Sequence, residues 1–76
     1  MDYAFLNPES RAEIVRQRIL QMEQEHYQRE LDKKIAEGMP GGAGQQMLAD
    51  AAQAQAMIEA AIRVARAELA ELEGTK

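Results

Sequence analysis

The stretch LADAAQAQAMIEAAIRVARAELAEL, residues 48–72, decides the fold, because its apolar side chains recur at alternating spacings of three and four. This spacing is typical of an α-helix that packs one stripe, or seam, against a partner helix. Gln55 is the polar member of the seam, and a lone polar residue there typically fixes helix register. The seam consists of Leu48, Ala51, Gln55, Ile58, Ile62, Ala65, Leu69 and Leu72.

Helix-breaking residues bound this helix and indicate a second one before it. Segment 38–44 reads Gly-Met-Pro-Gly-Gly-Ala-Gly, which neither helix can cross, and Gly74 ends the later helix. Asn7-Pro8-Glu9 supplies a cap, a first-turn proline and an acidic residue for the positive end of the helix dipole. We therefore predict helices at 8–37 and 45–73, a turn at 38–44, an N-terminal arm at 1–6 and a tail at 74–76.

The matched helix lengths favour one all-α domain over residues 1–76. Each helix is about 45 Å long at 1.5 Å per residue. Two such helices joined by a short glycine turn predict an antiparallel hairpin.

The first helix carries more apolar surface than one partner helix can cover. One stripe is Ala12, Val15, Ile19 and Met22, and the other is Leu20, Tyr27, Leu31 and Ile35. The two stripes are roughly 130° apart on a helical wheel. We therefore predict a dimer that forms a four-helix bundle, or a larger closed oligomer. The predicted interface residues are Val15, Ile19, Met22, Tyr27, Leu31, Ile35, Leu48, Gln55, Ile58, Ile62, Leu69 and Leu72.

Length, charge and composition limit the class of partner. The chain has 76 residues, no cysteine and a net charge of -4, with its basic residues scattered among acidic ones. A chain this short buries only about 60% of its unfolded surface, so association is its remaining means of stabilisation. We expect no nucleic-acid or membrane partner, a cytoplasmic location, and a protein partner that contacts the helix faces or the arm around Tyr3 and Phe5.

Glu23-Gln24-Glu25-His26 contains the one histidine of the chain, three residues after a glutamate. Residues three apart share a helix face, and di-iron bundles combine a Glu-x-x-His on one helix with a carboxylate from another. A hairpin that folds symmetrically about Gly41 places Glu59 across from Glu23. Glu23, His26 and Glu59 are therefore candidate ligands for iron or zinc, in a half-site that a second chain completes.

The Glu23-x-x-His26 pair with an opposed glutamate resembles the half-site of encapsulated ferritins, whose subunits are also helical hairpins. The resemblance implies a metal centre shared by two chains and is limited to these residues. In that family the Glu-x-x-His lies on the second helix, whereas here it lies on the first. The competing interpretation is an interface histidine beside Val15, Ile19 and Met22. In that interpretation Glu59 pairs with Arg63.

The sequence contains no motif that indicates a reaction. It lacks a phosphate-binding loop and a nucleophile elbow, and its hydroxyls besides tyrosine are Ser10 and Thr75. We predict a chain that is not an enzyme and needs no cofactor: a small structural or interaction protein that self-associates and serves a protein partner as adaptor or regulator. The alternatives are the metal-binding bundle and a subunit that folds on a different protein.

Overall fold

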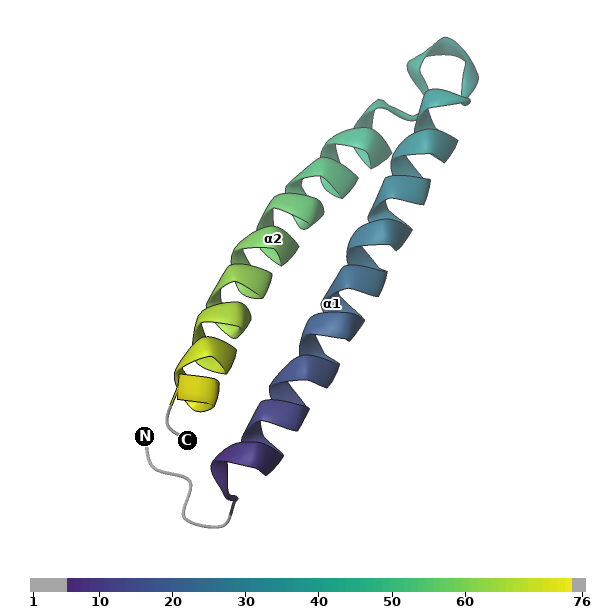
Figure 1. Cartoon of the computed structure of the whole chain (residues 1–76). Helices are drawn as coiled ribbons and strands as arrows, with labels where there is room; N and C mark the ends of the chain where they lie inside the picture. Colours follow the sequence, from purple (N-terminus) through teal and green to yellow (C-terminus); the bar gives the residue numbers. More distant parts are fainter. Residues whose placement is uncertain (1–5, 75–76) are drawn as a thin grey trace.

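The computed structural model describes residues 6–74, which form two long helices and the turn between them (Figure 1). Helix α1 spans Pro8–Glu37, the 3-10 helix η1 spans Pro40–Gly42, and α2 spans Gln45–Gly74. The predicted all-α hairpin is confirmed, since the described residues contain these helices and no strand. Tyr3 and Phe5 of the predicted arm lie outside the described residues.

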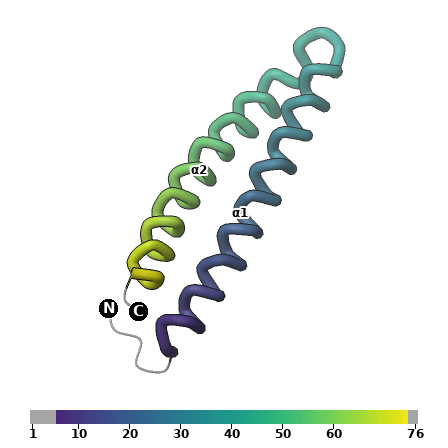
Figure 2. The backbone as a smooth tube through the Cα atoms, viewed as in Figure 1, coloured from purple at the N-terminus to yellow at the C-terminus, as the bar shows by residue number. Residues whose placement is uncertain are grey.

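The two helices lie side by side in an elongated molecule about 55 Å long. The Pro8 end of α1 and the Gly74 end of α2 lie at the same end of the hairpin (Figure 1). Figure 2 follows the backbone from α1 through the turn and back along α2. The helices are therefore antiparallel.

Helix α1 begins where the cap chemistry predicts. The Oδ1 atom of Asn7 accepts a hydrogen bond of 2.7 Å from the backbone N–H of Ser10, and Pro8 occupies the first turn. Asn7 thereby satisfies one of the backbone donors that every helix start leaves without an intrahelical partner.

The chain reverses direction at two glycines after α1. Gly38 ends α1 with φ -80°, and its N–H donates to the carbonyls of Lys34 and Ile35. Gly41 and Gly42 have φ of 63° and 76°, in the left-handed region that favours glycine. The reversal therefore depends on Gly41 and Gly42, whereas Gly38 keeps a conformation open to other residues.

Gly44 brings the start of α2 against the end of α1. Gly44 is buried, and a Cβ atom at this position would overlap the backbone of Ala36, including its carbonyl oxygen. Ala36 is itself a buried residue. The absence of a side chain at Gly44 thus sets how closely the helices approach beside the turn.

One stripe of each helix forms a narrow core. Ile19 and Met22 of α1 pack with Ile62 of α2, and Val15, Ile58, Ala65 and Leu69 are partly buried against this cluster. The other buried apolar residues are Ala12, Ala36, Ala51 and Leu72. The predicted seam of α2 is therefore in contact with α1 of the same chain.

Gln55 is buried in this seam with its amide bonded across the helices. Its Nε2 donates to the carbonyl oxygen of His26 at 3.3 Å and to Glu30 at 3.2 Å, while its Oε1 accepts from Lys33 Nζ at 3.1 Å. An unpaired buried amide costs on the order of 1–3 kcal/mol, so the helices are held at the alignment that supplies these partners. This arrangement supports the predicted role of Gln55 in fixing register.

Replacing Gly44 by alanine should destabilise the hairpin by about 1–3 kcal/mol, because the backbone of Ala36 must move to admit the methyl group. Urea unfolding followed by circular dichroism measures the change. Gly74→Ala is the matched control, since a Cβ there meets nothing within 4 Å. Equal stability of the two variants would contradict the close approach at Gly44.

Replacing Gln55 by leucine should leave the melting temperature unchanged or raised, because leucine packs in the seam and the part-exposed Glu30 and Lys33 can bind water. The variant should instead lose specificity and sediment as a mixture of species. Gln55→Ala is the comparison: it leaves a cavity and should cost about 1–3 kcal/mol. A leucine variant less stable than the alanine variant would argue against this account.

Candidate functional site

Cross-helix ion pairs follow one side of the hairpin. Arg16 Nη2 lies 2.9 Å from Glu73 Oε2, and Arg66 Nη2 lies 3.2 Å from Glu23 Oε2. Each step of seven residues along α1 is matched by a step of seven back along α2, as expected for flanking positions of antiparallel heptads. These side chains are about half exposed. Each pair therefore contributes at most roughly 1 kcal/mol, and its main effect is to favour one alignment.

The next heptad step along this side would bring two carboxylates together, Glu30 of α1 and Glu59 of α2. Each carboxylate instead bonds a different side chain. Glu59 Oε2 lies 3.2 Å from His26 Nε2, while Glu30 accepts from Gln55 and lies 3.5 Å from Lys33. His26 and Gln55 therefore give each of the two carboxylates its own hydrogen-bond partner.

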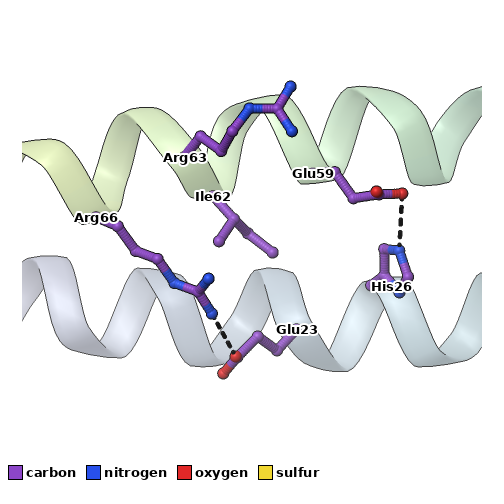
Figure 3. A pocket seen from close by; sticks show the side chains of 6 residues that line it. All are labelled: Glu23, His26, Glu59, Ile62, Arg63 and Arg66. Carbon is purple, nitrogen blue, oxygen red and sulfur yellow. Dashed lines mark hydrogen bonds and ion pairs between the residues drawn. The ribbon is translucent and has the colours of Figure 1, made fainter.

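The candidate metal ligands line one groove, together with Ile62, Arg63 and Arg66 (Figure 3). The structure brings His26 and Glu59 together, but the carboxylate of Glu23 points to Arg66. Among residues 6–74, no group of three or more histidine, aspartate or glutamate side chains is placed to hold a metal ion. Iron or zinc binding stays a prediction that depends on ligands from another chain.

Glu23 and Glu59 line the same groove, but their carboxylates bond different partners. Flanking residues of antiparallel helices are staggered relative to the core positions, so Glu23 reaches Arg66, further along α2. The expected pair of Glu59 with Arg63 is also replaced, because Glu59 bonds His26. In Figure 3 the guanidinium of Arg63 extends away from α1.

The opposite side of the hairpin is an apolar groove. Its α1 wall includes Ile14, Val15 and Met22, and its α2 wall includes Val64 with the alanines beside it. Arg18 and Glu68 complete the lining. The hairpin thus has one side bridged by ion pairs and one side that is mainly hydrocarbon.

The second stripe of α1 is uncovered in the single chain. Leu20, Tyr27 and Ile35 are 55–59% exposed, and Leu31 is 41% exposed. Over the described residues, ten large hydrophobic side chains are exposed, whereas the large ones in the core are Ile19, Met22, Ile62 and Leu72. One hairpin therefore exposes more of its large apolar side chains than it buries.

The predicted interface residues fall into two groups. Three of them, Tyr27, Leu31 and Ile35, are exposed on α1. The others are buried or half-buried between α1 and α2: Val15, Ile19, Met22, Leu48, Gln55, Ile58, Ile62, Leu69 and Leu72. The sequence reasoning missed exposed Ile14, Met57 and Val64, which share one heptad position outside the core stripes.

Comparisons of the chain with protein-family models, with curated proteins and with solved structures give no match. The described part of the chain contains no helix that combines the length and apolar character needed to cross a membrane. Any function must therefore be inferred from the surface of the hairpin itself.

Glu30 should make the hairpin sensitive to acid. The hydrogen bond from Gln55 and the charge of Lys33 lower the pKa of Glu30 below its ordinary value of 4.5. Because the folded pKa is depressed, the carboxylate stabilises the folded chain above pH 4.5, and this contribution is lost as the pH falls through the lowered pKa. Glu30→Gln should therefore lose less stability than the parent chain between pH 7 and pH 3.

Urea midpoints at both pH values measure this difference. The control is Glu25→Gln, which removes an exposed carboxylate that makes no cross-helix ion pair within residues 6–74. The same acid dependence in the Glu30 variant and the control would show that the Glu30 contacts contribute nothing.

Proposed function

We propose that this chain is a small interaction protein, a helical hairpin that self-associates through its exposed apolar faces and serves a protein partner as an adaptor or regulator. The observation that supports this proposal is the excess of exposed large hydrophobic side chains over buried ones. Contiguous apolar patches on soluble proteins commonly mark sites of protein association. A cytoplasmic location remains part of the proposal.

The core of a single hairpin is small for independent stability. No large side chain among the described residues is fully buried, and the cross-helix ion pairs are too exposed to add much. A second layer of helices would bury the stripe of Leu20, Tyr27 and Leu31. This burial would stabilise the folded hairpin. Self-association and folding are thus coupled in this proposal.

Adaptor function fits the presence of two separate apolar surfaces. The α1 stripe and the groove beside Val64 lie on different parts of the molecule, so one can hold another copy while the other remains accessible. The mixed charges around these surfaces suit a protein partner better than a phosphate backbone, which requires clustered basic residues. The chemistry of the groove favours an amphipathic helix as ligand.

At micromolar concentration the chain should sediment as a dimer or larger species, and Leu31→Glu should raise the dissociation constant by at least roughly tenfold, because a charge enters an apolar contact. Light scattering after size exclusion and sedimentation equilibrium measure both effects. Gln53→Glu is the control, since it places the same charge on an exposed position of α2.

Two outcomes would redirect the proposal. A monomer that melts sharply at micromolar concentration would contradict self-association. A monomer that is poorly folded alone would instead favour the alternative in which a different protein completes the apolar surface.

A further inference from the structure

The exposed stripe of α1 is part of a second heptad pattern on that helix. Leu20, Tyr27 and Leu31 are exposed large hydrophobic residues at spacings of seven and four. With the polar residues between and beyond them they form a continuous run at alternating spacings of three and four. We call this run the outer seam: Gln17, Leu20, Gln24, Tyr27, Leu31 and Lys34.

We propose that the outer seam binds the outer seam of a second copy of this chain, with the two α1 helices antiparallel and Leu20 packed against the partner's Leu31. The inference depends on the proposed self-association and specifies which surface mediates it. A two-fold axis then passes between Gln24 and Tyr27, and each contact occurs twice.

The outer seam matches itself when one copy is reversed. Leu20 meets the partner's Leu31, and Leu31 meets the partner's Leu20. Gln24 then faces the partner's Tyr27, which offers an aromatic surface and a hydroxyl. The polar ends also meet, since Gln17 faces the partner's Lys34. Leucine therefore contacts leucine in two layers, glutamine contacts tyrosine in the two layers beside the axis, and the outermost residues are polar.

The heptad geometry observed inside the hairpin predicts the flanking contacts of this alignment. Within the hairpin, Arg16 lies four residues after core residue Ala12 and meets Glu73, one residue after core residue Leu72. An antiparallel pair has a second flank on the other side of its core. There, the residue just before one core residue meets the residue four places before the core residue that it packs against. Applied to Leu31 and the partner's Leu20, this rule pairs Glu30 with the partner's Arg16.

The flanking charges are complementary. Glu30 and Arg16 each keep part of the side chain exposed, so each can accept a second partner. They form two opposite-charge contacts related by the two-fold axis. The two copies of Glu23 also approach each other at that axis, but each already lies 3.2 Å from an Arg66 guanidinium that offsets its charge. The other flank is uncharged, with Gln21, Gln28 and Ile35.

Other alignments of two α1 helices are less favourable. A parallel pair places Lys34 against the partner's Lys34 within the contact. Sliding the antiparallel pair by one heptad in one direction places Leu20 against the partner's Gly38 and brings Glu23 to the partner's Glu30 twice. Sliding it in the other direction places Leu31 against the partner's Glu13, which removes the contact between leucines. Like charges in such positions reduce affinity, so the Leu20–Leu31 alignment is the one in which packing and charge agree.

Disulfide trapping tests the alignment, because the chain has no cysteine of its own. A Leu20→Cys chain mixed with a Leu31→Cys chain should form mostly the mixed disulfide-linked dimer on mild oxidation, with each variant alone forming much less. Val64→Cys, on an apolar position of α2 that is more exposed than Leu20 or Leu31, is the control and should not cross-link with either. Circular dichroism checks that each variant stays helical.

A second variant tests the same contact through affinity. Gln24→Leu adds an apolar side chain opposite the partner's Tyr27, so the dimer dissociation constant should fall roughly tenfold. Gln53→Leu makes the same change on exposed α2 and should leave it unchanged. A stable dimer with no cross-link between the Leu20→Cys and Leu31→Cys chains and no effect of Gln24→Leu would overturn this alignment but leave self-association intact. A well-folded monomer would overturn both.

Discussion

The contact between the seam of α2 and the first stripe of α1 is the constraint on which the rest of the structure depends. It uses the largest apolar residues of α2, so the large apolar side chains outside the two stripes lie on outer surfaces of the described hairpin. It also fixes which charged residues meet across the helices, because the flanking positions follow from the core alignment. The ion-paired side, the apolar groove and the exposed stripe of α1 are all consequences of that one alignment.

Two polar residues, Gln55 and His26, select one of several helix alignments that the apolar residues alone would allow. Alanines and leucines at heptad spacing can pack after a slide of one heptad with little loss. A slide would cost Gln55 three hydrogen bonds and would break the contact between His26 and Glu59. The middle of the hairpin is therefore the part in which polar chemistry, and not hydrophobic area, selects the structure.

The helices could be predicted from local chemistry along the chain. The contacts of the candidate site could not, because they depend on how the two helices are aligned. Asn7, Pro8 and the glycines act on their own neighbours, so their effects can be read along the chain. The pairing of Glu23 with Arg66 depends on the stagger between flanking positions, and a simple fold about Gly41 omits that stagger. Ile14 and Val64 were missed because each lies outside the core stripe of its own helix, and only the packed pair of helices forms the groove that they line.

The turn also has a consequence for exchange between molecules. Hairpins can swap helices if the turn opens and α1 continues into α2 as a single rod. In this chain the rod would have to accommodate Pro40 and four glycines within a helix, at about 3 kcal/mol for the proline and about 1 kcal/mol for each glycine relative to alanine. Whatever these molecules assemble into, each unit should enter and leave the assembly as an intact, folded-back chain.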